Sequence, residues 1–395
     1  MRIVIERAWC ARGFGDFRPV LQTAPQNFTA LLDRPIELTV VIPTFNEKDN
    51  VARLFERLAI ALAGIEWEAI YVDDASRDGT PDILSAMAQS DRRIRLIRRF
   101  NRRGLSSAVL EGMLASTSPV IAVIDADLQH DESILPDLHR AVASGSAQLA
   151  VGTRYAGGGS VGEWDQGRAL ISRAATSLAG LVIKTPISDP MSGFFAIDRA
   201  ALLAAAPQVS GIGYKILLDL VASSPTALSV AEVPYRFRNR DAGESKLDSA
   251  VAVEYFELLL EKLIGRFVPI RFVMFGLVGG LGLGVHLTML SVALNLAGLS
   301  FAVAQSVAVM SAMTFNFVLN NRITYRDRRL TGSRFLFGLA SFYLVCAVGA
   351  VANVGIGEML YRGKESWWLA GAAGAMVGSV WNYAIGGLVT WRKRR

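Results

Sequence analysis

The chain has 395 residues, of which 52% are hydrophobic and 19% are charged. This length predicts two or three domains, and so low a charge content is unusual for a protein that is soluble throughout. Only two cysteines occur, Cys10 and Cys346, far apart and in different kinds of segment, so no disulfide framework or thiolate metal site is implied. The net charge of +6 comes with basic residues beside apolar segments, which favours anionic lipid over nucleic acid as a partner.

After an N-terminal extension, residues 1–36, the first half of the chain alternates between strand and helix patterns. The extension lacks the apolar core and cleavage site of a signal peptide, and we assign it no function. The alternation predicts a doubly wound α/β sheet, whose ligands bind at the carboxyl ends of the strands. Strands are predicted over residues 36–42, 68–72, 94–97 and 119–124, and helices over 47–63, from Thr80 and over 105–115.

Polar runs follow three of these predicted strands, at residues 43–47, 73–80 and 125–130. One such run is often a turn or a helix cap, but three at the same sheet edge are better explained as a binding site. In the last run Asp125, Asp127 and Gln129 stand at alternate positions and offer hard oxygen ligands. Mg²⁺ or Mn²⁺ prefers such ligands and typically also holds substrate phosphates, so the run suggests an enzyme that handles a nucleotide diphosphate.

Together the runs resemble those of the family 2 glycosyltransferases of GT-A fold, and more narrowly the dolichol/polyprenol-phosphate mannosyltransferases. Matching runs continue downstream in the family's order, within about residues 37–265. They are Gly-Leu-Ser-Ser-Ala-Val-Leu-Glu-Gly at 104–112, Gly-Thr-Arg-Tyr at 152–155, Asp-Pro-Met-Ser-Gly-Phe-Phe at 189–195, and residues 237–246 ending in Gly-Glu-Ser-Lys. Phe45 departs from the Tyr usual there but keeps a ring that could stack on a base. The resemblance implies a GT-A catalytic domain over residues 37–246.

The resemblance also implies roles for individual residues. Asp127, Arg240 and Lys246 would carry catalysis, with the two cations closing over the diphosphate on a glycine-containing loop. The divalent cation would be held by Asp125, Asp127 and Gln129, and the acceptor phosphate by Arg154, Arg168 and Ser172. The nucleotide sugar would be held by Pro43, Phe45, Glu47, Val72, Asp74, Asp125, Ala126, Asp127, Arg240 and Lys246.

Two helical patterns are candidates for lying on the cytoplasmic leaflet of a membrane. Residues 167–184 combine an apolar face with basic residues, although an ordinary surface helix fits that pattern equally well. Residues 247–267 lead directly into the apolar half of the chain. We therefore expect an interfacial helix or linker over residues 247–270.

The second half is predicted to be an all-α domain of four membrane-spanning helices, residues 271–395. Its apolar stretches at 272–296, 301–319, 335–360 and 367–390 are long enough to cross a bilayer. Basic residues lie before the first, between the second and third, and after the fourth. By the positive-inside rule, the catalytic domain and both termini should be cytoplasmic.

The membrane half is also internally repeated, which indicates a duplicated two-helix hairpin. Phe315-Asn316-Phe317 with Thr324-Tyr325-Arg326 is echoed by Trp381-Asn382-Tyr383 with Thr390-Trp391-Arg392 at the same spacing. We expect Asn316 and Asn382 to bond between helices rather than recognise a headgroup, and the glycines at 276–284 to serve close packing. This half resembles the GtrA-like four-span proteins, for which anchoring is a simpler role than flipping a lipid.

The expected reaction is metal-dependent transfer of a sugar, with inversion, to a polyprenyl or dolichyl phosphate. Mannose from GDP-mannose is favoured by the runs at 189–195 and 213–216, and a UDP-sugar such as UDP-glucose is the nearest alternative. A processive polysaccharide synthase is disfavoured because no Gln-x-x-Arg-Trp run occurs. A lipid flippase with a degenerate cytosolic domain is disfavoured because the set Asp125, Asp127 and Gln129 is intact, as are Arg240 and Lys246.

Overall fold

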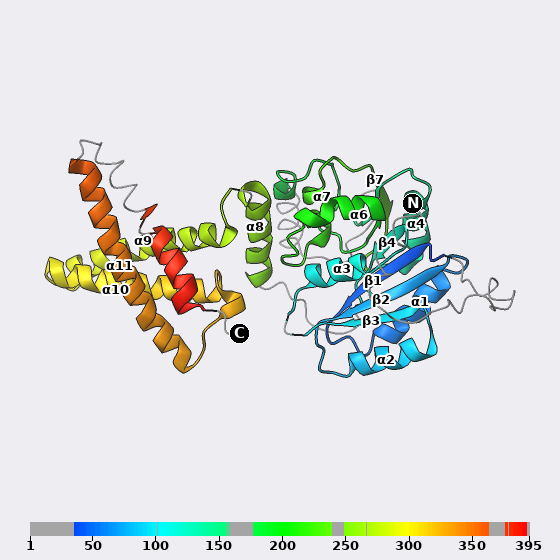
Figure 1. Cartoon of the computed structure of the whole chain (residues 1–395), viewed down its shortest axis with the longest axis horizontal. Helices are drawn as coiled ribbons and strands as arrows, with labels where there is room; N and C mark the ends of the chain where they lie inside the picture. The colour runs from blue at the N-terminus through cyan, green and yellow to red at the C-terminus, as the bar shows by residue number, and fades with distance from the viewer. Residues whose placement is uncertain are drawn as a thin grey trace, which may run out of the picture.

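The chain folds into an α/β domain and a helical unit, with helix α8 (Ser249–Ile264) standing between them (Figure 1). The structure, a computed structural model, describes residues 35–100, 102–155, 157, 177–238, 249–265, 267–362, 376–377 and 379–392.

The α/β domain is built on one seven-stranded sheet in the order β3-β2-β1-β4-β6-β5-β7. Only β6 runs antiparallel to its neighbours, so the sheet is mixed rather than fully parallel. The four predicted strands are confirmed to within two residues at each end. The strands are β1 (Leu38–Thr44), β2 (Trp67–Asp73), β3 (Ile94–Arg98), β4 (Val120–Val123), β5 (Leu149–Thr153), β6 (Phe195–Asp198) and β7 (Val230–Pro234).

Strand β1 runs further than its sequence predicts, through Pro43 to Thr44. Its pairing with β4 stops at Val41, whereas its pairing with β2 continues to Thr44. Pro43 therefore lies where β1 has a neighbour on one side only, a position that a residue without an N–H tolerates. The extension carries the polar run at residues 43–47 beyond the end of β4.

Helices cover both faces of the sheet, because side chains alternate between the faces along each strand. Val40 and Ile42 of β1 belong to one buried core and Val41 to the other. The first core includes α1 (Val51–Ala61), α2 (Thr80–Ser90) and α4 (Leu135–Ala143). The second includes α3 (Leu105–Leu114), α6 (Arg199–Ala205) and α7 (Ile216–Ser223). Short 3₁₀ turns occur at Glu132–Ile134, Ala206–Gln208 and Arg326–Arg328.

The helical unit contains α9 (Ile270–Asn295), α10 (Phe301–Arg322), α11 (Ser333–Arg362) and a last helical stretch at 379–385 that continues into a π-helical turn, Gly386–Thr390. Two described helices are long and apolar enough to cross a membrane, Ile270–Asn295 and Val303–Arg322, and α11 adds a shorter apolar stretch, Ser333–Gly349. Much of the fourth expected span lies outside the described residues, so the count of four stays a prediction. Of the expected interfacial helices, α8 is present, and most of 167–184 lies outside the described residues.

Residues that are equivalent in the two hairpins meet one another in the helical unit. Tyr325 stacks on Trp391 with ring centroids 4.2 Å apart. Asn316 packs against Gly282 of α9, and in the second hairpin Asn382 packs against Gly349 of α11. These matched pairs fit the duplication expected from the sequence.

Candidate active site

The three polar runs meet where the winding of the sheet changes direction. The chain proceeds from β1 outwards to β2 and β3, then returns to place β4 on the other side of β1. A crevice at the carboxyl ends of two such strands is the usual ligand site of an open α/β sheet. Residues 43–47 follow β1, residues 125–130 follow β4, and residues 73–80 continue from the neighbouring β2.

Backbone strain marks each of these runs. Among the described residues, the non-glycine positions with positive φ are Asn46 (58°), Ala75 (58°) and Leu128 (63°). One lies in each of the three runs. Side chains other than glycine rarely adopt this conformation, and it persists where the surrounding structure holds it for a local purpose. The three strand ends are therefore shaped alike, at one edge of the sheet.

Asp125 is oriented by a buried histidine. Its backbone N–H donates to Nδ1 of His130 at 3.3 Å, and its Oδ2 lies 3.8 Å from Nε2 of the same ring. His130 is enclosed by Phe194, Tyr235 and Phe237, and burial lowers its pKa to about 4. The ring is thus neutral near pH 7, and it fixes the carboxylate without carrying a charge.

Asp127 and Gln129 complete the turn after β4. Oδ1 of Asp127 accepts the N–H of Gln129 at 3.2 Å. Gln129 in turn accepts the N–H of Arg238 at 2.9 Å and donates its side-chain Nε2 to the Arg238 carbonyl at 3.2 Å. The guanidinium of Arg238 pairs with Asp131 and Glu132 at 2.9 and 2.6 Å. The start of the run predicted to close over the diphosphate is thereby anchored beside Gln129.

The donor set at this turn suits a hard divalent cation. Two carboxylates and one amide oxygen are the ligand types that Mg²⁺ and Mn²⁺ prefer. A Cβ at Gly193 would lie 3.0 Å from Oδ2 of Asp125, so a glycine there keeps the space beside the carboxylate open. In the described part of the chain, no group of three His, Cys, Asp or Glu side chains converges as a metal site. A cation here would depend on the amide of Gln129 and on oxygens from a substrate.

Phe45 and Glu47 lie on the side of β1. The guanidinium of Arg103 lies 4.6 Å from the centre of the Phe45 ring, within the range of a cation–π contact. Glu47 accepts a hydrogen bond from Asn50 at 2.8 Å, and its backbone N–H donates to Thr80. This bond ties the first polar run to the second.

Pro43, Val72 and Asp74 stand side by side at the ends of β1 and β2. Pro43 pairs in register with Val72, and the N–H of Asp74 donates to the carbonyl of Thr44 at 3.0 Å. Both oxygens of the Asp74 carboxylate are hydrogen-bonded, one by Arg99 and one by the backbone of Gly104. Ala126, between the two carboxylates after β4, is buried.

Arg154 is brought to a carboxylate that sequence reasoning gave no separate role. Its Nε and Nη2 donate to the two oxygens of Asp189 at 2.7 and 2.8 Å, and Asp189 is fully buried. The guanidinium also lies over the rings of Tyr155 and Phe237. Arg168, Ser172, Arg240 and Lys246 lie outside the described residues, so their predicted roles stay predictions.

Lys215 is a candidate that the sequence reasoning missed. Its Nζ donates to the carbonyl of Met191 at 3.4 Å, and its charge interacts with Arg154, Asp125 and Asp189. Burial lowers the pKa of its ammonium group. The residue stands in the run 213–216 that marked the family resemblance, but nothing in its local pattern distinguishes it from a surface lysine.

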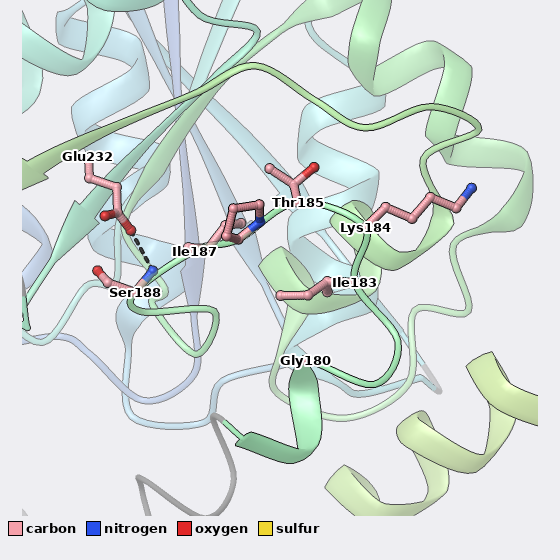
Figure 2. Close-up of a pocket in the computed structure, with 8 residues that line it drawn as sticks. Gly180, Ile183, Lys184, Thr185, Ile187, Ser188 and Glu232 are labelled. Carbon is pink, nitrogen blue, oxygen red and sulfur yellow. Dashed lines mark hydrogen bonds between the residues drawn. The ribbon is translucent and has the colours of Figure 1, made fainter.

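An open pocket of about 580 Å³ lies next to the run that contains Asp189 (Figure 2). Its lining includes Lys184, Thr185, Ser188 and Glu232, and the Ser188 N–H donates to the Glu232 carboxylate at 2.6 Å. None of the strand-end carboxylates lines it. The pocket therefore adjoins the run at residues 189–195 without belonging to the site at the carboxyl edge.

Comparison with known proteins assigns both halves of the chain. Residues 39–204 match the family described as glycosyl transferase family 2, and residues 274–391 match the GtrA/DPMS transmembrane domain. A dolichol-phosphate mannosyltransferase of Pyrococcus furiosus is 34% identical over 358 residues, which cover 90% of this chain and 99% of the relative. The chain belongs to the dolichol-phosphate mannosyltransferases. It is thus a glycosyltransferase with a membrane domain, and the family expected from the sequence is confirmed.

Other relatives match a smaller share of the chain. The dolichol-phosphate mannosyltransferase of Mycosarcoma maydis is 39% identical over 246 residues, covering 60% of this chain and 83% of the relative. That of Saccharomyces cerevisiae is 35% identical over 249 residues, covering 61% and 92%. Among solved structures, glucosyl-3-phosphoglycerate synthase from Mycobacterium tuberculosis, in complex with Mn²⁺, UDP and glucosyl-3-phosphoglycerate, is 19% identical with a TM-score of 0.40, covering 57% of this chain and 79% of that one.

Proposed function

We propose that the enzyme transfers mannose from GDP-mannose to a polyprenyl or dolichyl phosphate at the cytoplasmic face of the membrane. A phosphate oxygen of the lipid attacks the anomeric carbon as the bond to the diphosphate breaks, and the configuration inverts. A phosphate monoester is already anionic near neutral pH, so the attack needs no dedicated general base. Alignment and charge stabilisation then supply most of the catalysis.

The observation that carries this proposal is the convergence of three strained strand ends at one edge of the sheet. Asn46, Ala75 and Leu128 are each held in a left-handed conformation, one in each motif run. If the runs served only as turns between strands and helices, a left-handed residue in each of the three would not be needed. A nucleotide sugar is large enough to contact all three runs at once.

Within this site the donor would lie along the ends of β1, β2 and β4. Phe45, Pro43, Val72, Asp74 and Glu47 would hold the base and ribose. Asp125, Asp127 and Gln129 would hold Mg²⁺ or Mn²⁺, which neutralises the diphosphate as it departs. The neutral His130 fixes Asp125 in place and keeps positive charge away from its cation-binding oxygens.

The closing loop and the acceptor side complete the proposal. Arg238, anchored beside Gln129, comes two residues before Arg240 in the sequence, which supports a role for Arg240 and Lys246 above the diphosphate. The acceptor phosphate would be held by Arg154, Arg168 and Ser172. Arg154 is held rigidly by Asp189, so it would offer the lipid phosphate a charge of fixed position.

For the membrane part, we propose four spans over residues 271–395, with 247–270 as an interfacial linker and both termini cytoplasmic. Contacts at one end of the unit support this orientation. Arg271 at the start of α9 pairs with Asp327 after α10 at 2.9 Å. Arg326 pairs with Glu257 of α8 at 2.8 Å, and Trp391 stacks on Tyr325. The start of the unit, its central loop and its last helix thus meet on the side of the catalytic domain.

A donor panel tests the proposal. Purified full-length protein in nanodiscs would receive polyprenyl or dolichyl phosphate and radiolabelled GDP-mannose, UDP-glucose or UDP-N-acetylglucosamine, and label in the lipid extract would be counted. We expect transfer from GDP-mannose only, lost with EDTA and restored by Mg²⁺ or Mn²⁺. Transfer from UDP-glucose instead would show that the donor is not GDP-mannose. No transfer from any of the three would refute the proposed reaction.

A further inference from the structure

Arg99 is a buried cation just beyond the end of a fourth strand, in a basic stretch to which the sequence interpretation gave no role. It directly follows β3, and only 2% of the residue is exposed. Its Nη1 donates to Oδ1 of Asp74 at 2.7 Å and to the carbonyl of Gly104 at 3.1 Å, and its Nη2 donates to Ser107 at 2.7 Å. Its Nε lies 3.3 Å from Glu111. An arginine held by four groups on two elements has a single orientation.

The structure is arranged to keep Arg99 against Asp74. Gly104 has φ of 143°, a conformation suited to glycine, and its N–H donates to the second oxygen of Asp74 at 2.8 Å. At Gly112, later in α3, a side chain would not fit, because a Cβ there would overlap Val41 and Val72. The close approach of α3 to β1 and β2 thus brings Gly104 and Ser107 to the guanidinium.

The charge state of Asp74 depends on these neighbours. The pKa of its carboxyl group is raised above the usual value, chiefly by burial and further by the neighbouring Asp73, while the N–H of Gly104 and the charge of Arg99 lower it. Glu111 of α3 faces Arg99 from the other side. Without the guanidinium, the N–H of Gly104 would be left to oppose burial and Asp73, and the carboxyl group would hold its proton to higher pH.

A carboxylate and a carboxylic acid select different bases. An ionised carboxylate is an acceptor only, and each oxygen keeps a lone pair beyond the one that Arg99 or Gly104 occupies. Guanine presents two neighbouring N–H donors on its pairing edge. Adenine presents one donor and one acceptor, and uracil presents one donor between two acceptors. An Asp74 that stays ionised therefore favours guanine.

We infer that Arg99 is a positioning residue for donor recognition, which holds Asp74 ionised and correctly oriented so that the site selects guanine nucleotides. The inference rests on the proposed function, in which Asp74 contacts the base. It assigns a specificity role to a residue that contacts no substrate itself.

The test compares the full-length wild type with Arg99→Gln, and with Arg95→Gln as a matched control. Arg95 is on the same strand and pairs with Glu68 at 3.1 Å, away from the polar runs. Transfer kinetics with GDP-mannose would be measured from pH 6 to 8.5, with GDP, IDP and ADP as competing inhibitors. IDP lacks one of the two guanine donors.

For Arg99→Gln we expect the KM for GDP-mannose to rise by about 10- to 100-fold near pH 6.5, the range for losing hydrogen bonds to a charged group, with kcat nearly unchanged. The KM should fall again as the pH is raised and Asp74 ionises. The preference for GDP over ADP should shrink by about tenfold or more. Wild type and Arg95→Gln should show neither change.

An unchanged base preference in folded Arg99→Gln would overturn the inference. Equal weakening of the binding of all three nucleotides, with no pH dependence, would also overturn it, because that is what a merely structural role predicts.

If Arg99→Gln does not fold, Ser107→Ala provides the test, since it removes one anchor of the guanidinium and keeps the charge. It should reduce the preference for GDP over ADP by about threefold, and an unchanged preference overturns the inference. Absence of transfer by the wild type would instead count against the proposed function.

Discussion

Glycine and asparagine have opposite uses in the two halves of the molecule. In the catalytic half, Asn46 and Gly104 adopt positive φ in the loops between a strand and the next helix. In the membrane half, Gly282 and Gly349 stay helical and let Asn316 and Asn382 pack against their helices. A backbone in lipid must keep its helical hydrogen bonds, so small residues there allow close packing instead of turns. The same residue type therefore has to be interpreted according to the solvent around it.

Charges are distributed just as differently. The catalytic half buries ionised side chains in pairs, such as Arg99 with Asp74 and Arg154 with Asp189. In the described part of the membrane unit, the ion pairs lie at the end that faces the catalytic half, around residues 326–328. Helix α8 belongs to both environments, because it pairs with the catalytic domain near its end and with the membrane unit near its middle. Substitutions in each region should thus have separable effects on activity and on stability.

The largest expected effect is on activity alone. Replacing Asp127 with Ala should lower transfer by at least about a thousandfold. The proposed divalent cation, which would stabilise the leaving diphosphate, would lose one of its ligands. The thermal midpoint in detergent should stay within about 2 °C of wild type, since Asp127 lies at a partly exposed turn. Asp137→Ala is the control, because it removes an equally acidic but exposed partner of Arg140 on α4. Full activity of Asp127→Ala at saturating Mg²⁺ would remove the metal assignment.

The next effect is on the stability of the catalytic half. Nζ of Lys262 is nearly buried and lies 2.6 Å from the fully buried Asp219, 2.8 Å from Ser223 and 2.9 Å from the carbonyl of Gln208. Lys262→Met should leave Asp219 buried without its cation and cost about 3 kcal/mol. Thermal unfolding in detergent would show this as a midpoint lowered by about 5 °C or more. Arg140→Met, at an exposed pair, should change the midpoint by less than about 1 °C, and an equal change in both variants would contradict the buried pairing.

Much of the sheet could be predicted because buried strands leave apolar runs of β-branched residues in the sequence. The reversal of β6 could not, because an apolar run looks the same in either direction. The three polar runs, at residues 43–47, 73–80 and 125–130, were predictable from their position after strands. Arg99, Asp189 and Lys215 were not, since each acquires its significance from a partner about 25 to 35 residues away that only the fold brings near.

Interpretation of the membrane half was limited in a similar way. The repeat predicted that Asn316 and Asn382 would have equivalent places, and the structure supports this. Yet among Gly276, Gly279, Gly280, Gly282 and Gly284, which share one pattern, only Gly282 faces another side chain closely. Lys262 precedes the first apolar stretch in the sequence, as a basic residue flanking a membrane span would, yet it pairs with the buried Asp219 of the catalytic domain.

The glycines of α9 offer a sharper test of helix packing. A Cβ at Gly282 would overlap the Asn316 amide, whereas a Cβ at Gly279 would meet nothing within 4 Å. Gly282→Ala should therefore lower the stability of the membrane unit by about 1–3 kcal/mol, while Gly279→Ala should be neutral or slightly stabilising. Gly349→Ala should reproduce the loss in the second hairpin. Thermal unfolding in one detergent would rank the three variants, and equal effects at Gly279 and Gly282 would contradict the packing described.

The smallest expected effect concerns the contact that joins the two halves. Arg326 of the membrane unit pairs with Glu257 of α8 at 2.8 Å, but its side chain is one-third exposed, so solvent screens the pair. Arg326→Met should cost less than about 1 kcal/mol, and the loss should shrink further as salt is raised. Arg326→Met and Lys262→Met therefore compare the two contacts of α8, a partly exposed one with the membrane unit and a nearly buried one with the catalytic domain. A loss at Arg326 as large as that at Lys262 would mean that α8 unfolds with the membrane unit as well as with the catalytic domain. The two halves would then be one cooperative structure, and substitutions in the membrane unit would no longer have effects separable from those in the catalytic half.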